Sequence, residues 1–260
     1  MGRRDPRPRL CPVLHRKVAV SRETKSPPLA AGPSAAAARP FHVKQMGPFA
    51  SPDSILRLKE DLNQLQEQLR SLGSRLDDRW MAPLWEYACL LLHWSHRMNL
   101  VSPGDRTQLF TKHIGPACLM AELVESVPHA TVVDYGSGAG FPGIPLKIVF
   151  PHSLFYLVEV RRKRASFLRT VIRTLSLSKV VVVNQRLEEW TCPSGPVDLV
   201  VSRATAGTDV TERVRAHLAP RGSILTTLPS ASEHTKVPLS GVRKEFPGFP
   251  TIVLFAPPTI

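Results

Sequence analysis

Residues 132–143, VVDYGSGAGFPG, carry most of the information about the fold of this 260-residue chain. They read as a short strand of β-branched residues, an acid at the strand's end, and glycines that lead into a helix beginning near Pro142. Glycine has no Cβ atom, so it permits tight turns and lets a ligand approach the backbone closely. A helix that starts there presents free N–H groups to an anionic ligand. The stretch therefore predicts a nucleotide-type cofactor loop after the first strand of an α/β sheet.

Two cofactors fit this loop. Gly138, Gly140 and Gly143 match the G-x-G-x-x-G pattern of dinucleotide-binding proteins. Read from Asp134, the same residues give D-x-G-x-G-x-G, the pattern of S-adenosylmethionine (SAM) methyltransferases, which also explains the acid. The next apolar strand ends at Glu159, which in either fold accepts hydrogen bonds from the ribose hydroxyls. The loop favours SAM over NAD, and a glycine-rich turn without a ligand is the remaining alternative.

Apolar strands and helices alternate through the rest of the chain. This alternation predicts a parallel sheet with helices on both faces, in which ligands bind beyond the carboxyl ends of the strands. The glycine loop, Glu159, residues 184–188 and Ser202-Arg203 all fall at such ends, so we expect a single site there. Two closing strands are expected to form an antiparallel pair at one edge. The expected strands lie near 131–134, 155–159, 179–184, 197–202, 222–227, 242–246 and 251–255.

Helices are predicted ahead of this core. Ser51-Pro52-Asp53 is a helix-start signal, and leucines then recur at three- and four-residue steps from Ile55 to Leu76. Such a stripe is also found in coiled-coil dimers, but Gly73 interrupts this short helix, so we expect it to pack onto the core of a monomer. A second helix is expected over about 80–98. The predicted divisions are a disordered basic extension (1–50), a helical segment (51–120) and a SAM-binding domain (121–260).

The first 45 residues differ from the rest in being rich in Arg, Pro and Ala. They hold ten Lys/Arg against Asp5 and Glu23, which is +8 of the chain's net charge of +13. Disorder is the expected state. A translation start upstream of the true one near Met46, an organellar transit peptide and an RNA-binding arm all fit this composition. An inert or artefactual extension is the favoured interpretation, and no apolar core of a secretory signal follows the arginines.

Composition bounds the protein class. The sequence contains no run of about 18 apolar residues that would cross a membrane. A net charge of +13 suits a phosphate-rich partner without establishing one. The scattered cysteines have no C-x-x-C spacing, which favours reduced thiols in a cytoplasmic compartment and predicts no metal site. These cysteines are Cys11, Cys89, Cys118 and Cys192.

Four segments, taken in chain order, are more informative about the protein family than the glycines alone. They are WSHRMNLVS (94–102), the glycine loop continued through Ile144-Pro145-Leu146, KRASFL (163–168), and RLEE (186–189) with Ser202-Arg203-Ala204 after the next strand. In sequence and spacing these segments resemble those of the bacterial 16S rRNA guanine-N7 methyltransferase family, the RsmG or GidB type. The resemblance extends from about Ile55 onward. The P-G-I-P-L continuation and the S-R-A segment are more specific than the glycines.

The resemblance implies a class I, Rossmann-like SAM methyltransferase fold with a seven-stranded, mostly parallel sheet. It also implies SAM as cofactor and methylation of guanine N7 in 16S rRNA of the small ribosomal subunit. The N7 lone pair is free at neutral pH, so no catalytic base is needed, and Arg203 either meets the SAM carboxylate or orients the guanine. Arg161, Lys163 and Arg164 are expected to contact RNA, and Lys112 and His113, which resemble the family's basic-His pair, are expected to reach either the RNA or the SAM loop. The implied cofactor residues are Asp134, Gly136, Gly138, Gly140, Phe141, Glu159, Leu187, Glu188 and Arg203.

The chain also departs from the family pattern. The family usually has Lys-Gly after the fifth strand, where this chain reads Thr226-Thr227-Leu228-Pro229-Ser230, and the closing strands match poorly beyond Gly241. The family commonly has Asp at the position of Glu159. Three alternatives stay open: a SAM methyltransferase acting on another RNA or a small molecule, a degenerate RNA-binding module without activity, and an NAD oxidoreductase. The last needs a hydride-transfer partner that we cannot place.

Overall fold

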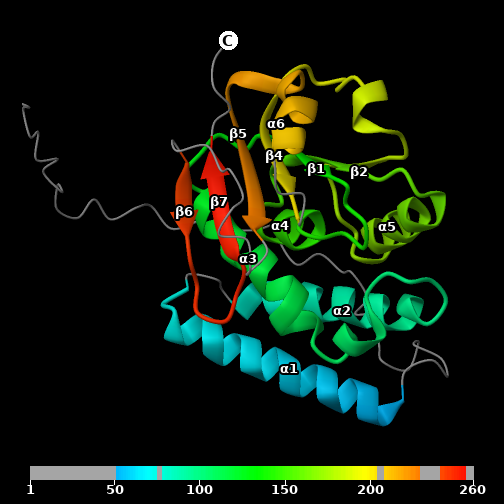
Figure 1. Cartoon of the computed structure of the whole chain (residues 1–260). Coiled ribbons are helices and arrows are strands. Elements are labelled where there is room, and N and C mark those ends of the chain that lie inside the picture. Colours follow the sequence, from blue (N-terminus) through cyan, green and yellow to red (C-terminus); the bar gives the residue numbers. More distant parts are fainter. Residues whose placement is uncertain (1–50, 75–77, 204–207, 229–240, 256–260) are drawn as a thin grey trace, which may run out of the picture. The chain divides into compact units, whose positions relative to one another are not determined.

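The computed structural model describes residues 51–74, 78–203, 208–228 and 241–255 (Figure 1). The extension predicted over residues 1–50 lies outside these ranges, as do Cys11 and Leu76. Across the described ranges, no helix is both long enough and apolar enough to span a bilayer. Cys89, Cys118 and Cys192 are buried free thiols.

Seven strands form one mostly parallel sheet in the order β3-β2-β1-β4-β5-β7-β6. The first five strands run parallel, whereas β7 runs antiparallel to both β5 and β6. This confirms the predicted sheet and its antiparallel edge pair. The strands are β1 (Thr131–Tyr135), β2 (Leu154–Val158), β3 (Val180–Val183), β4 (Val197–Ser202), β5 (Leu218–Leu228), β6 (Val242–Lys244) and β7 (Thr251–Phe255).

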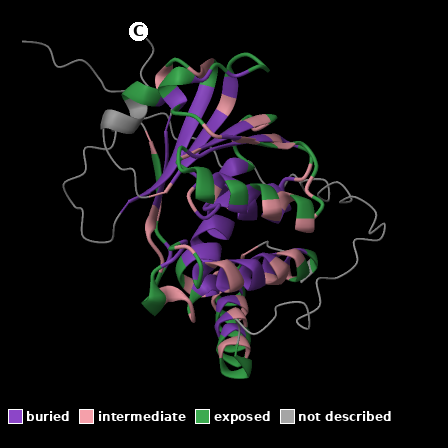
Figure 2. Cartoon of the chain, turned by 90° about the vertical axis from the view of Figure 1, so that its right-hand side faces the viewer, coloured by how far each residue is buried: buried purple, intermediate pink, exposed green. Residues whose placement is uncertain are grey.

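The sheet separates two apolar layers. Val132 of β1 belongs to the layer that includes α4 and α5, whereas its neighbour Val133 belongs to the layer that includes α6. Both faces of the central strands are therefore buried between helices (Figure 2). This is why these strands read as continuous apolar runs in the sequence. The covering helices are α4 (Gly143–Val149), α5 (Arg162–Thr174) and α6 (Thr208–Arg215).

The helices that precede β1 pack into the first of these layers. Ser51 caps α1 by accepting a hydrogen bond from the Ser54 N–H at 3.2 Å. Leu58 and Leu65 of α1 are fully buried in the same apolar cluster as β1 residues, so the leucine stripe packs onto the core as predicted. These elements are α1 (Pro52–Ser71), η2 (Asp78–Trp80), α2 (Met81–Ser95), η3 (Pro103–Asp105) and α3 (Gly115–Val124); the short helix η5 (Leu187–Glu189) follows β3.

A π-helical turn, η4 (Phe110–Ile114), runs directly into α3 and is held by α1. Asp61 of α1 is buried and accepts hydrogen bonds from the backbone N–H of Phe110 at 2.6 Å and of Thr111 at 3.2 Å. It also accepts one from the Thr111 hydroxyl at 2.6 Å. Helix α1 therefore fixes the start of the turn that carries His113.

Three predicted boundaries were wrong. Helix α2 ends at Ser95 instead of residue 98, because the Trp94 carbonyl accepts N–H bonds in a turn that closes the helix. Strand β5 begins at Leu218 instead of residue 222, since Leu218 already pairs with β4. The sequence did not indicate this earlier start, because it contains Pro220 and Gly222, and both residue types are uncommon inside strands. Strand β6 ends at Lys244 instead of residue 246.

Candidate functional site

The loop between β1 and α4 is tied to the neighbouring strand. The backbone N–H groups of Gly136 and Ser137 both donate to the carbonyl oxygen of Val158 at 3.0 Å. Gly136, Gly138 and Gly140 have φ angles of 72°, 57° and 106°. Side-chain-bearing residues rarely adopt these values, so the backbone path of the loop accounts for the spacing of its glycines.

Asp134 supports the loop from behind. Its side chain is fully buried, and Oδ2 accepts the backbone N–H of Gly143 at 3.1 Å. Burial raises the pKa of Asp134 to about 7. The first N–H of α4 thus binds a protein carboxyl, so the expectation that this N–H is free to face a ligand was wrong. The reason is close packing: Gly143 has no Cβ, and α4 therefore lies directly against Asp134.

Tyr87 of α2 is a second support, and sequence reasoning missed it. Its fully buried hydroxyl donates to the carbonyl oxygen of Ala139 at 2.7 Å. A Cβ atom on Gly140 would lie 2.7 Å from that hydroxyl and 2.7 Å from Cγ1 of Ile144. Tyr87 sits in an apolar helix pattern, which gave no signal of a contact 52 residues away.

Glu159, at the end of β2, joins the loop to the start of α5. Oε2 accepts the N–H of Gly138 at 2.9 Å, and Oε1 accepts the N–H of Arg161 at 2.7 Å. The Asn184 amide donates to the Glu159 carbonyl oxygen at 2.7 Å, which links the end of β3 to the same place. Each carboxylate oxygen keeps a further lone pair, so the residue retains the capacity to accept from a ribose hydroxyl.

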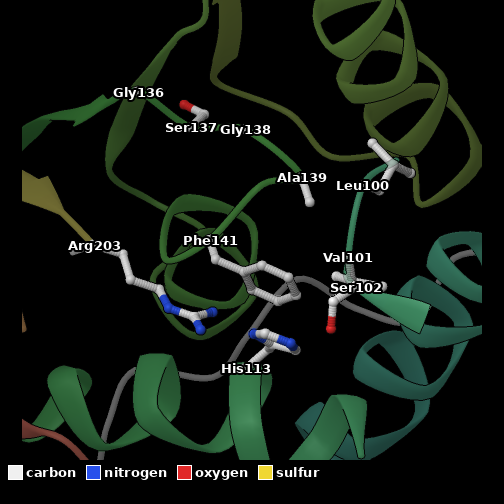
Figure 3. Close-up of a pocket in the computed structure, with 10 residues that line it drawn as sticks. All are labelled: Leu100, Val101, Ser102, His113, Gly136, Ser137, Gly138, Ala139, Phe141 and Arg203. Carbon is white, nitrogen blue, oxygen red and sulfur yellow. The ribbon is translucent and has the colours of Figure 1, made fainter. Parts of the chain in front are cut away.

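A cavity of about 280 Å³ lies over the loop (Figure 3). Of the residues predicted to bind the cofactor, Gly136, Gly138, Phe141 and Arg203 line it. His113, which was expected to reach either the RNA or the SAM loop, lines it as well. The last residues of the WSHRMNLVS segment, which carried the family resemblance without an assigned role, form the opposite side. The remaining lining residues are Leu100, Val101, Ser102, Ser137 and Ala139.

Three side chains meet in this cavity around the Phe141 ring (Figure 3). The His113 ring stacks on it, with centroids 5.2 Å apart and planes 22° apart. The Arg203 guanidinium lies over the same ring, 5.5 Å from its centroid. Burial, together with the nearby Arg203 charge, lowers the pKa of His113 to about 4. His113 is therefore neutral at physiological pH, and Arg203 is the cation of the group.

The other predicted residues lie at or beyond the margins of this cavity. Glu188 pairs with Arg213 at 2.9 Å on the surface, and Leu187 is buried beside it. Lys112 pairs with Asp105 at 2.7 Å. Arg161 and Lys163 are exposed at the start of α5, whereas Arg164 turns back and donates to the Asn99 carbonyl oxygen at 3.2 Å.

The lining fits a nucleotide cofactor. Gly136 lines the cavity, and a Cβ atom on it would meet no atom within 4 Å, so a side chain there would enter open space. Among the described residues, no carboxylate pairs with Arg203, which leaves its charge available for an anionic ligand group. The strand order, the glycine loop after β1 and the acid after β2 together define a class I SAM-dependent methyltransferase.

Comparison with known proteins narrows this class. The profile of the family described as "rRNA small subunit methyltransferase G" (GidB) matches residues 81–236. A protein of that name from Chlorobaculum tepidum is 31% identical over 198 residues, which cover 75% of this chain and 90% of that protein. Its namesake from Cellvibrio japonicus is 33% identical over 192 residues, covering 73% and 85%. The chain belongs to the rRNA small subunit methyltransferase G family.

Solved structures show a weaker likeness. TrmN from Thermus thermophilus aligns with a TM-score of 0.43 and 18% identity, over 55% of this chain and 48% of that one. The ribosomal protein L11 methylase from Lactobacillus delbrueckii subsp. bulgaricus aligns with a TM-score of 0.40 and 15% identity, over 55% and 77%.

Proposed function

We propose that this chain transfers the methyl group of SAM to N7 of a guanine in 16S rRNA of the small ribosomal subunit. Besides membership of the family, one structural observation supports this methyl-transfer proposal. A cavity over the glycine loop brings together Phe141, neutral His113 and Arg203, a cation that pairs with no carboxylate among the described residues. The cavity therefore has a backbone cradle on one side and groups able to meet a planar base and an anionic group on the other.

SAM, when bound, supplies a methyl group attached to a positively charged sulfur. The backbone of Gly136 and Gly138 would lie along it, and the Glu159 carboxylate would accept from its ribose. Leu187 and Glu188 are the candidates for flanking the adenine. Asp134, Gly140 and Phe141 complete the implied set, the first two by holding the loop in shape.

The side chains of the site position the base without removing a proton. Guanine N7 carries a free lone pair at neutral pH, so catalysis can rest on holding N7 close to the methyl carbon, at about 3–3.5 Å. The methylated base becomes a cation. His113 suits such a site because its pKa of about 4 keeps it uncharged beside Arg203. Arg203 is proposed to orient the guanine or to bind the SAM carboxylate.

RNA contact is proposed at the basic start of α5. Arg161, Lys163 and Arg164 cluster there, next to the end of β2 that joins the glycine loop. Lys112 is half-exposed at the other margin of the site. Backbone phosphates are bound mainly by such Lys and Arg side chains, and these contacts position the RNA without reading its sequence.

We also infer that the chain acts as a monomer in a cytoplasm-like, reducing compartment. The leucine stripe of α1 is buried within the chain, which supports a monomer. The three described cysteines are free, which supports the compartment.

The proposal is tested by transferring labelled methyl from SAM to small ribosomal subunits that lack their native modification, and mapping the product. We expect one labelled 7-methylguanine, abolished by Gly136→Asp and by Arg203→Ala. Gly195→Asp is the matched control, because Gly195 also has a positive φ, 80°, and open space around it. SAM binding without transfer to the subunit would retain the cofactor and favour another RNA or a small molecule. RNA binding without SAM binding would favour the inactive module.

A further inference from the structure

A second cavity lies behind His113 and Arg203. Its volume is about 380 Å³, and it shares these two residues with the cofactor cavity. Helix α1 contributes Gln64 and Gln68, and the chain around η3 and η4 contributes Asp105 and Gln108. The volume falls in the range of small-molecule sites, and the lining is mostly polar. None of the residues quoted for the family resemblance predicts a role for α1 in a site.

Unpaired polar groups belong to residues that line this cavity. His113 is nine-tenths buried, and its Nε2 lies 3.6 Å from Oδ2 of Asp105, beyond hydrogen-bond distance, so neither ring nitrogen makes a hydrogen bond among the described residues. Oε1 of Gln68 is likewise buried without a partner. Buried polar groups in folded proteins are nearly always paired, because an unpaired one loses its hydration without compensation. The unpaired Gln68 oxygen is an acceptor and favours a ligand that carries hydrogen-bond donors, whereas neutral His113 offers one donor and one acceptor.

Asp105 adds a fixed negative charge to the same cavity. Its Oδ1 accepts from Lys112 Nζ at 2.7 Å and its Oδ2 from the Ser102 hydroxyl at 2.7 Å. The Lys112 bond is the largest of the influences that lower the pKa of Asp105, so the group is ionised at neutral pH. A carboxylate oxygen accepts more than one hydrogen bond, and both oxygens therefore keep the capacity to accept from a ligand.

Guanine matches this distribution of groups. Its Watson–Crick edge carries two adjacent donors, N1–H and the 2-amino group, followed by the acceptor O6, and O6 and N7 form the acceptor pair of the adjoining Hoogsteen edge. The acceptors Asp105 and Gln68 suit the donor edge. Donors from Arg203 suit O6, which is next to N7. Adenine presents an acceptor at N1, where a carboxylate would be repelled.

We propose that the cavity between α1 and η4 receives the target guanine base, with its Watson–Crick edge on Asp105 and Gln68 and its N7 edge toward the cofactor cavity. This inference rests on the proposed function, since it names where that substrate binds. His113 and Arg203, which line both cavities, flank the passage from the base to the methyl group. A base enters such a cavity only when it is splayed out of the RNA, as in a loop or bulge. The Asp105 charge also favours the cation formed on methylation.

Replacing the target guanosine with inosine tests this orientation, because inosine lacks only the 2-amino group. Subunits are reconstituted with either nucleoside at the mapped position, and single-turnover transfer is measured. Wild-type protein is expected to prefer guanosine by about tenfold or more, since a charge-assisted hydrogen bond is lost with inosine. Asp105→Asn is expected to slow transfer to guanosine and reduce the preference to within about twofold. SAM affinity, measured by calorimetry, should stay within about threefold of wild type, because Asp105 reaches the cofactor cavity only through its hydrogen bond from Ser102, which the amide oxygen of the variant can still accept.

A second variant tests the same cavity independently, in case Asp105→Asn fails to fold. Gln68→Leu removes the unpaired acceptor with little change in volume, and the expected result is at least about a threefold loss of transfer to guanosine with SAM affinity retained. Gln66→Leu is the matched control, because Gln66 is on the same helix and lines neither cavity. Full guanosine preference in Asp105→Asn, or wild-type transfer in both variants, would overturn the inference while leaving the proposed function standing. Absence of any wild-type transfer to guanosine subunits would instead overturn the proposed function.

Discussion

The two sides of the cofactor cavity are built in different ways. The loop wall, residues 136–141, is continuous in sequence, and its glycines are required by its own backbone angles. The opposite wall, named the helical wall after the helices that support it, consists of His113 of η4 and the loop residues Leu100, Val101 and Ser102 between α2 and η3. Contacts with distant residues hold it, such as the Asp61 bond to Phe110 and the Arg164 bond to Asn99. A local motif thus provides the cofactor cradle, whereas tertiary packing of the N-terminal helices provides the side that faces the substrate. Damage to the first should abolish cofactor binding, and damage to the second should impair transfer.

The largest effect is expected from breaking the loop wall with Gly140→Ala. A Cβ atom there would lie 2.7 Å from both Ile144 and the Tyr87 hydroxyl, and φ is 106°. Calorimetry should show a loss of SAM affinity of about 100-fold or more, since the loop cannot keep its path. Gly195→Ala is the control, because it carries a similar φ of 80° with no atom within 4 Å. Equal SAM affinity in the two variants would contradict the tight packing of the loop.

Asp61→Ala removes a residue that supports the helical wall. We expect it to slow methyl transfer clearly and to change cofactor binding much less. The substitution removes the acceptor of three hydrogen bonds at the start of η4. We expect a loss of about 2 kcal/mol in unfolding free energy and about a tenfold loss in methyl transfer, with SAM affinity within about threefold. Urea denaturation and single-turnover transfer measure the two. Asp53→Ala, in the exposed first turn of the same helix, should lose less than about 1 kcal/mol and transfer methyl at the wild-type rate.

The walls also differ in the sign of their pH dependence. Burial raises the pKa of Asp134, which lies behind the loop wall, to about 7. The contribution of protonated Asp134 to folding stability is therefore complete below its unfolded pKa of about 3.9, and it is lost as pH rises through 7. Burial lowers the pKa of His113, in the helical wall, to about 4, so its stabilisation is present above about 6.5 and is lost as pH falls through 4.

Urea denaturation of two single variants separates these opposing contributions. Between pH 5 and pH 8, the unfolding free energy of Asp134→Asn should rise by about 2 kcal/mol relative to that of wild type. Only in wild type does the native state hold a proton on residue 134 that it loses over this range. From pH 7 down to pH 4, His113→Gln should lose less stability than wild type. Variants that parallel wild type over both ranges would show that neither group titrates as described.

The smallest effect is expected from Lys163→Gln, which leaves both walls intact. Lys163 is exposed at the start of α5, where we propose phosphate contact. Affinity for the small subunit should fall about two- to fourfold, and the slope of log affinity against log salt should decrease by about one. Lys59→Gln removes an exposed charge from α1 and is the control. An unchanged salt slope would remove Lys163 from the RNA interface.

The same contrast explains what the sequence could predict. The strand order and the loop wall follow from local patterns, namely β-branched runs, glycine spacing and acids at strand ends. Tyr87 and Asp61 were missed because their partners are 52 and about 50 residues away. Asp61 lies on the buried side of an amphipathic helix, where the apolar pattern predicts an apolar residue. The acid is explained only by its hydrogen bonds to the backbone of η4. For His113 the family resemblance left the RNA and the SAM loop as alternatives, and its burial against Phe141 of the loop is a tertiary contact that the sequence did not decide.

The account depends most on the identity of the cofactor, so the most direct test is calorimetric titration of the full chain with SAM and, separately, with NAD. We predict one SAM bound per chain, displaced by S-adenosylhomocysteine, and no heat from NAD. Binding of NAD without SAM, or of neither by a chain that unfolds cooperatively, would contradict the assignment of the glycine loop and with it the methyltransferase.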